Sequence, residues 1–189
     1  MTDRAHIIVI LAGGGAVRMG GADKGLIEWQ GERLIDRIYK RLSPQEDIVI
    51  SGRHDYGLSC PVVPDREDST LKGPAAGLEA ILRWMSECGL PQSGFFTVPV
   101  DGPNPPLDLT ERLAGDTCAV AVDGEDYAQP TFAYWERAAL TAVLASSETA
   151  PAPSLKFLAQ KCAARRVIWT ENHAFLNINS ANDLSQQYE

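Results

Sequence analysis

The amino-acid sequence predicts an α/β fold: a mostly parallel sheet with helices on both faces, in a single domain over residues 1–189. Apolar runs typical of buried strands alternate along the chain with amphipathic segments typical of helices. That alternation is characteristic of a layered α/β domain. The chain shows no internal repeat, and its proline-rich segment TAPAPS, at 149–154, is too short to link two domains.

The first half of the chain starts this alternation. HIIVILA at 6–12 is a continuous apolar run, as expected of a strand covered on both faces. Residues 32–43 place apolar side chains at helical spacing opposite a charged face, which predicts a helix. DIVIS at 47–51 and CPVVP at 60–64 are predicted strands. GPAAGLEAILRWMSECG at 73–89 is a predicted helix, with Gly-Pro at its start and Gly at its end.

The second half continues in the same way. Its apolar, strand-like segments are 94–100, 117–123, 129–135 and 165–170. Its helix-like segments are 108–115, 136–147, 154–163 and 180–189. Ser180 is a suitable N-cap for the last of these helices.

Composition limits the classes of function. Hydrophobic residues at 44% and charged residues at 22% are ordinary for a soluble globular protein. The net charge of −8 argues against a nucleic-acid partner, so an anionic ligand must be small and held by local groups. The cysteines form no CxxC pair and predict reduced thiols without a zinc site. The N-terminal apolar run is too short for a signal peptide, and no stretch approaches a membrane span, so we expect a cytoplasmic protein.

The stretch LAGGGAVRMGGADKG, at 11–25, holds six glycines and two cations directly after the first predicted strand. Glycine lets backbone amides approach a ligand closely, and successive amides form a concavity that binds phosphate. The dinucleotide pattern GxGxxG fails because its third glycine would be Arg18. The P-loop pattern fails because Gly21 and Ala22 stand in place of Lys and Ser or Thr. Arg18 and Lys24 could together neutralise a triphosphate; a surface loop with solvated cations is the alternative.

A second informative stretch is VPVDGP at 98–103, in which Asp101 follows an apolar strand directly. Its carboxylate is expected at the carboxyl edge of the sheet, where it could hold Mg²⁺ bridged to substrate phosphates. An Asx-turn capped by Asp101 is an equally good interpretation of this segment alone. Nucleotidyl transfer needs alignment and charge stabilisation but no protein nucleophile, which suits a chain without a serine elbow or a histidine cluster.

LAGGGAVRMGGADKGLIEWQGERLIDRI closely resembles the signature of the nucleotidyltransferases with a GT-A-like, Rossmann-like α/β fold. Within that group the chain is most similar to the molybdenum cofactor guanylyltransferases. The other matching segments, spread along the chain, are the turn Gly73-Pro74-Ala75-Ala76-Gly77, Asp101 with Pro103, the pair Pro130-Thr131, and the ending FLNINSANDL at 175–184.

The resemblance implies a role for each matched residue. Leu11, Ala12 and Gly13 would contact the guanine nucleotide, and Gly14 and Gly15 would surround its phosphates. Arg18, Lys24 and Asp101 would be the catalytic residues, the first two as phosphate-neutralising cations and the third as the Mg²⁺ ligand. Asp65 would read the base or ribose. Asn177 and Asn179 would lie near the pterin, although a turn between strand and helix explains them nearly as well.

The resemblance also implies a reaction and its partners. The phosphate of molybdopterin would attack the α-phosphorus of GTP and release pyrophosphate. Proteins that carry molybdopterin and chaperones of molybdoenzymes would be transient partners. The chain departs from the family in having Val100-Asp101-Gly102-Pro103 where Cys-Asp-Thr-Pro is frequent, and in lacking a clear asparagine after the second strand.

Three alternatives stay open from the sequence. One is a cytidylyltransferase of the same cofactor, although Leu11-Ala12-Gly13-Gly14 and Gly73-Pro74 favour the guanylyl enzyme. Another is a sugar-1-phosphate nucleotidyltransferase, a class that tends to be longer than this chain, or another small-substrate NTP transferase. The third is a non-catalytic relative that binds nucleotide or pterin, which would be expected to lose Lys24 or Asp101 first.

Overall fold

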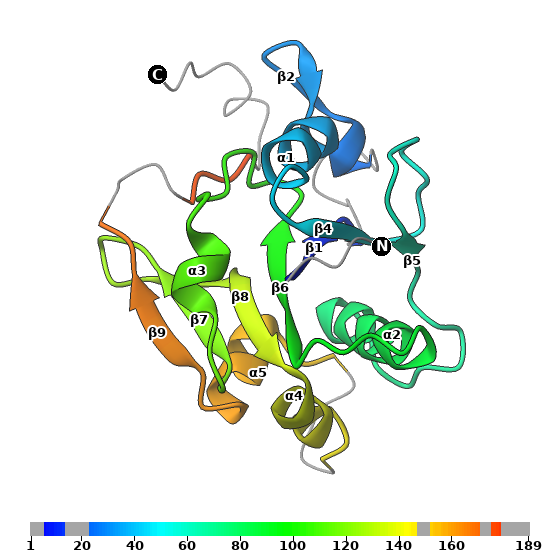
Figure 1. Ribbon diagram of the computed structural model, residues 1–189, viewed down its shortest axis with the longest axis vertical. Coiled ribbons are helices and arrows are strands. Elements are labelled where there is room, and N and C mark those ends of the chain that lie inside the picture. Colours follow the sequence, from blue (N-terminus) through cyan, green and yellow to red (C-terminus); the bar gives the residue numbers. More distant parts are fainter. Residues whose placement is uncertain (1–5, 14–22, 147–151, 171–174, 179–189) are drawn as a thin grey trace.

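A computed structural model describes residues 6–13, 23–146, 152–170 and 175–178, and its centre is a seven-stranded sheet (Figure 1). From one edge to the other, the strands are β5 (Val62–Val63), β4 (Asp47–Ser51), β1 (Ile7–Leu11), β6 (Gly94–Pro99), β8 (Ala128–Glu136), β7 (Ala119–Val122) and β9 (Arg165–Ile168). β8 is antiparallel to both of its neighbours, and the other pairs in the sheet are parallel. The predicted fold class, a mostly parallel sheet with helices on both faces, is confirmed.

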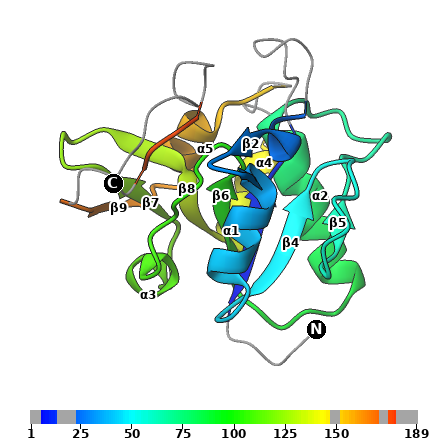
Figure 2. The same ribbon diagram turned by 90° about the horizontal axis from the view of Figure 1, so that it is seen from above.

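The inner strands of the sheet contribute side chains to two hydrophobic cores, because successive side chains point to opposite faces. In β1, Ile7 and Val9 join one core, whereas Ile8 and Ile10 join the other. The first core is covered by α2 (Pro74–Glu87), α4 (Arg137–Leu144) and α5 (Leu155–Lys161). The second is covered by α1 (Leu34–Leu42) and α3 (Leu109–Leu113). Figure 2 shows the two layers of helices on either side of the sheet.

Most predicted elements within the described residues appear close to their expected bounds. The segment predicted as a helix from 32 begins as a helix only at Leu34, because β3 (Glu32–Arg33) pairs with β2 (Glu28–Trp29) in a hairpin. The hairpin turn uses Gln30 and Gly31, both with positive φ, as a two-residue turn requires. The helix predicted at 180–189 lies outside the described residues. No helix among those described is long and apolar enough to span a membrane.

A third, smaller cluster ties the hairpin to the segment 175–178. Trp29 and Ile178 are buried together with Leu34, the first residue of α1. This packing brings the segment 175–178 beside the carboxyl ends of β1 and β6, where the predicted site residues lie.

Candidate active site at the carboxyl ends of the central strands

The end of β1 is fixed between its two neighbouring strands. The amides of Ala12 and Gly13 both donate to the carbonyl of Ser51 at 2.9 Å, and the amide of Val100 donates to the carbonyl of Leu11 at 3.2 Å. Leu11, Ala12 and Gly13 therefore lie at the predicted edge of the sheet, but two of their amides are already occupied by backbone. The amides of Ala12 and Gly13 are therefore not available to bind a phosphate.

The start of that stretch lies close to a second glycine, Gly52. A Cβ built on Gly52, the residue after β4, would lie 3.4 Å from the carbonyl carbon of Ala12 and from the nitrogen of Gly13. The two backbones thus approach each other tightly. Gly14, Gly15 and Arg18, which the sequence assigns to the phosphates, lie outside the described residues.

Lys24 is held by the residues on either side of it. It begins the short helix η2 (Lys24–Leu26), whose N-cap Asp23 accepts a hydrogen bond from the amide of Gly25 at 2.8 Å and from the hydroxyl of Tyr56 at 2.8 Å. Gly25 packs closely against the Tyr56 ring, because a Cβ added to it would be 2.7 Å from a ring carbon. Burial, followed by the hydrogen bond to Asp23, raises the pKa of the Tyr56 hydroxyl, so it stays a proton donor.

The ammonium of Lys24 meets the carboxylate of Asp101. Lys24 Nζ lies 2.7 Å from Asp101 Oδ2, and the two side chains are 25% and 19% exposed. Asp101 leaves the end of β6, and its carbonyl accepts a hydrogen bond from the amide of Ile178 at 2.7 Å. Two residues predicted to share a site, one from each of two distant loops, are therefore in direct contact.

A comparison within the chain shows what an Asx-turn would look like. Asp123 follows β7 as Asp101 follows β6, and its carboxylate accepts the amides of Glu125 and Tyr127 at 3.0 and 2.9 Å. The Asp101 carboxylate instead accepts the Lys24 ammonium. The geometry at Asp101 thus differs from that of a turn-capping aspartate.

Asp65 lies at another corner of the same edge. A Cβ built on Gly77, in the first turns of α2, would be 2.8 Å from Ser51 Oγ and 3.6 Å from Asp65 Oδ1. The Asp65 carboxylate and the Ser51 hydroxyl therefore both pack against the bare backbone of Gly77. Ser51, which is 3% exposed, links this corner to the end of β1 through its carbonyl. Ser51 is not predictable from the sequence, because a serine that ends an apolar strand carries no distinctive signal.

Asn177 contributes a polar atom whose bonding capacity is unused. Its Oδ1 is buried and has no hydrogen-bond partner within the described part of the chain. A buried acceptor without a partner is costly, and most such atoms in folded proteins are satisfied. Asn177 precedes Ile178, whose amide binds the Asp101 carbonyl, so this oxygen belongs to the neighbourhood of the site. Asn179 lies outside the described residues.

Residues 8–165 match the model of a protein family described as the MobA-like NTP transferase domain. This match decides to which family the chain belongs. The chain belongs to this family. The matched range contains Lys24, Asp65 and Asp101, and it ends before Asn177. The family relation predicted from the glycine-rich stretch is confirmed, and membership makes the chain a nucleotidyltransferase.

Relatives of this MobA-like NTP transferase are similar over nearly their whole length. A protein of Cereibacter sphaeroides named molybdenum cofactor guanylyltransferase is 38% identical over 186 residues, covering 94% of this chain and 93% of the relative. A protein of the same name from Shewanella putrefaciens is 33% identical over 192 residues, with the same coverage.

Solved structures share the fold at lower identity. Molybdopterin-guanine dinucleotide biosynthesis protein A from Archaeoglobus fulgidus superposes with a TM-score of 0.70 at 20% identity, covering 94% of each chain. The inositol-1-phosphate CTP transferase of T. maritima superposes with a TM-score of 0.66 at 15% identity, covering 96% of this chain and 92% of that one. One fold thus serves different nucleotides and acceptors, so the reaction must be argued from the site.

The donor atoms of this MobA-like NTP transferase fit a magnesium ion that is shared with a substrate. The described residues contain no group of three His, Cys, Asp or Glu side chains that could hold a metal by themselves. Mg²⁺ bound to nucleotides is held by one or two carboxylates, with phosphate oxygens and water as its other ligands. Asp101, partly exposed at the edge of the sheet, would supply one such carboxylate. The residues present fit this arrangement.

Proposed function

We propose that this chain transfers GMP from GTP to the phosphate of molybdopterin and releases pyrophosphate. A phosphate oxygen of the pterin would form a bond to the α-phosphorus of GTP, while the bond from that phosphorus to the leaving pyrophosphate breaks. The contact between Lys24 Nζ and Asp101 Oδ2 carries the proposal, because it brings together a cation of the kind that binds phosphate and a carboxylate of the kind that binds Mg²⁺. The names of the relatives from C. sphaeroides and S. putrefaciens support the choice of substrates.

Lys24 is proposed to bind the triphosphate. A nucleotide triphosphate carries several negative charges, so it competes with the single carboxylate of Asp101 for the ammonium. Lys24 Nζ would then neutralise phosphate oxygens and the charge that develops on the leaving pyrophosphate. Arg18, with the amides of Gly14 and Gly15, is proposed to share this work.

Asp101 is proposed to hold Mg²⁺, which would supply positive charge beside the phosphates when bound. Departure of the Lys24 ammonium to the nucleotide would leave the Asp101 carboxylate free for that ligation. Leu11, Ala12 and Gly13 are proposed to contact the guanine nucleotide, and their hydrogen bonds to Ser51 and Val100 fix where the glycine-rich stretch begins.

Asp65 is proposed to recognise guanine. The Watson–Crick edge of guanine presents two adjacent N–H donors, and a carboxylate offers two acceptor oxygens that match them. Adenine and cytosine do not present that pair of donors. The position of Asp65 beside Ser51 and Gly77, next to the end of β1, supports this role.

The pterin is proposed to lie on the side of Asn177 and Asn179. The unpaired, buried oxygen of Asn177 is the observation in favour, because a bound pterin offers N–H donors to it. The same proposal includes transient contact with proteins that carry molybdopterin and with molybdoenzyme chaperones. It also includes a cytoplasmic location and a single domain over 1–189.

One assay tests the proposal against its alternatives. The purified protein is incubated with Mg²⁺, molybdopterin on a carrier protein, and GTP, CTP or ATP in turn, and pyrophosphate and the dinucleotide product are measured. We expect both products with GTP. Products with CTP would identify a cytidylyltransferase instead. Tight GTP binding without pyrophosphate release would identify a non-catalytic binding protein.

A further inference from the structure

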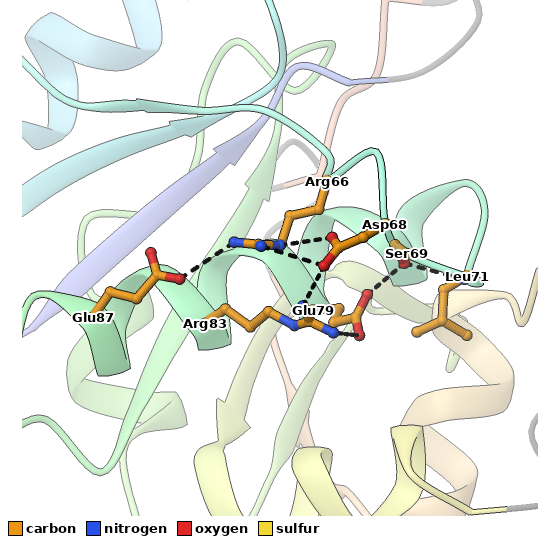
Figure 3. A network of polar contacts seen from close by, with 7 residues as sticks. All are labelled: Arg66, Asp68, Ser69, Leu71, Glu79, Arg83 and Glu87. Atoms are coloured by element: carbon orange, nitrogen blue, oxygen red, sulfur yellow. Dashed lines mark hydrogen bonds and ion pairs between the residues drawn. The ribbon is translucent and has the colours of Figure 1, made fainter.

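A network of charged side chains fastens the segment that follows Asp65 to helix α2. We call it the loop clasp; its members are Arg66, Asp68, Ser69, Glu79, Arg83 and Glu87 (Figure 3). The first three members lie in the segment 64–73 between β5 and α2, and the other three lie on α2. The clasp thus joins the Asp65 segment to the helix against which the Asp65 carboxylate packs.

The inner end of the clasp is buried. Ser69 is 8% exposed, and its hydroxyl donates to the Glu79 carboxylate while accepting the amide of Leu71 at 3.1 Å. A hydrogen bond to an ionised acceptor is stronger than one between neutral groups. Ser69 is therefore a buried anchor between the segment and α2.

The outer end of the clasp is a chain of alternating charges. Glu79 pairs with Arg83 at 3.0 Å, Arg83 with Asp68 at 3.3 Å, and Arg66 with Asp68 at 2.9 Å and with Glu87 at 3.3 Å. Single exposed ion pairs stabilise little, but a network with a forked arginine contact restricts each side chain more than a single pair does. The hydrogen bond from Arg66 lowers the pKa of the Asp68 carboxyl, which keeps it charged at ordinary pH.

We infer that the loop clasp is a positioning device for base selection: it holds the Asp65 carboxylate where it can match guanine. The inference rests on the proposed function. Gly77, at which an added Cβ would lie 3.6 Å from Asp65 Oδ1, and Glu79, which anchors Ser69, are two residues apart on α2. The same part of the helix therefore lies beside the carboxylate and holds the segment. Hydrogen-bond strength falls steeply with misalignment, so small movements of Asp65 would cost selectivity before they cost phosphate binding.

The test compares ligands with and without a base. Dissociation constants of the full chain for GTP, ATP and inorganic triphosphate are measured by calorimetry. In Ser69→Ala and in Glu79→Ala we expect the preference for GTP over ATP to fall about tenfold, while the affinity for inorganic triphosphate is unchanged. Glu79→Gln, which keeps an acceptor for Ser69, should recover part of the preference. Glu111→Ala, an exposed change on α3, is the matched control and should behave as wild type.

A double-mutant cycle separates positioning from general support. If the clasp acts through Asp65, Glu79→Ala should add no further loss of selectivity to Asp65→Asn. Arg83→Met serves as an independent clasp variant if Ser69→Ala melts at a much lower temperature. A GTP preference that survives in the folded clasp variants would overturn the inference, as would an equal loss of triphosphate affinity. A wild-type protein without any GTP preference would instead overturn the proposed function, and this inference with it.

Discussion

Lys24 Nζ and Asp101 Oδ2 lie 2.7 Å apart, although 77 positions of sequence separate the two residues. Each is held from its own side: Lys24 by the turn of η2, and Asp101 by the end of β6 and the amide of Ile178. Both side chains are more than half buried, so this pair is less screened by solvent than a surface pair.

Removing the charge of Asp101 should abolish turnover without unfolding the protein. Asp101→Asn keeps the shape of the side chain but removes the anionic donor for Mg²⁺, so we expect the rate of pyrophosphate release to fall by about a hundredfold or more. Asp123→Asn is the matched control, since Asp123 caps a turn after β7; it should lower the melting temperature and leave the rate unchanged. An Asp101→Asn protein that turns over like wild type would refute the metal-binding role.

Removing the charge of Lys24 should weaken nucleotide binding. Lys24→Met loses charge-assisted hydrogen bonds to phosphate, and we expect the dissociation constant for GTP to rise about 10- to 100-fold. The control is Lys40→Met: Lys40 of α1 pairs with Glu32 of β3, and its side chain is 72% exposed. Equal GTP affinities of the Lys24→Met and wild-type proteins would refute a phosphate-binding role for this ammonium.

A methyl group at position 25 should disturb the turn that carries Lys24. The added Cβ of Gly25→Ala would lie 2.7 Å from the buried Tyr56 ring. Either the ring or the helix η2 must therefore move. We expect a loss of about 1–3 kcal/mol in the free energy of unfolding, with weaker GTP binding, measured by denaturant titration and calorimetry. Gly115→Ala is the control, because a Cβ there meets only Arg165 at 3.7 Å. Equal stability of the two variants would contradict the tight packing of Gly25.

The thiols should differ in their response to pH. Burial, and then the charge of Asp55, raises the pKa of the Cys60 thiol from 9.0 to about 11, whereas Cys88 is exposed. The thiolate is the reactive form, so iodoacetamide at pH 8 should label Cys88 well before Cys60, and labelling of Cys60 should quicken about tenfold per pH unit. Because the fold favours the neutral thiol, its contribution to stability is complete below about pH 9 and is lost as the pH rises towards 11. Peptide mapping after timed labelling measures both thiols; early labelling of Cys60 would contradict the shift.

The strands of the sheet were predictable, because runs such as IIVIL in β1 and DIVIS in β4 are apolar on both faces. The order of the strands and the antiparallel direction of β8 were not predictable. A strand buried on both faces has the same pattern of apolar residues in either direction. The hairpin of β2 and β3 was missed because two-residue strands leave no periodicity to detect.

The charged residues of the site were predictable from the sequence, but the residues that hold them in place were not. Lys24 and Asp101 stand out because charged residues follow apolar strands and glycines. Their direct contact depends on how loops pack, which no local pattern encodes. Asp65 was identified through the family resemblance, whereas Ser51, Tyr56 and the clasp residues become visible only when the segments that carry them are brought together.

The separation of Lys24 and Asp101 along the chain has a consequence for folding. The two side chains can meet only after β1 has paired with β6, a long-range step that must overcome the entropy of closing a large loop. Partly folded chains with native helices but an unassembled central sheet would therefore be inert towards nucleotide. Binding competence would arise late, together with the pairing of the middle strands, so intermediates would not sequester GTP.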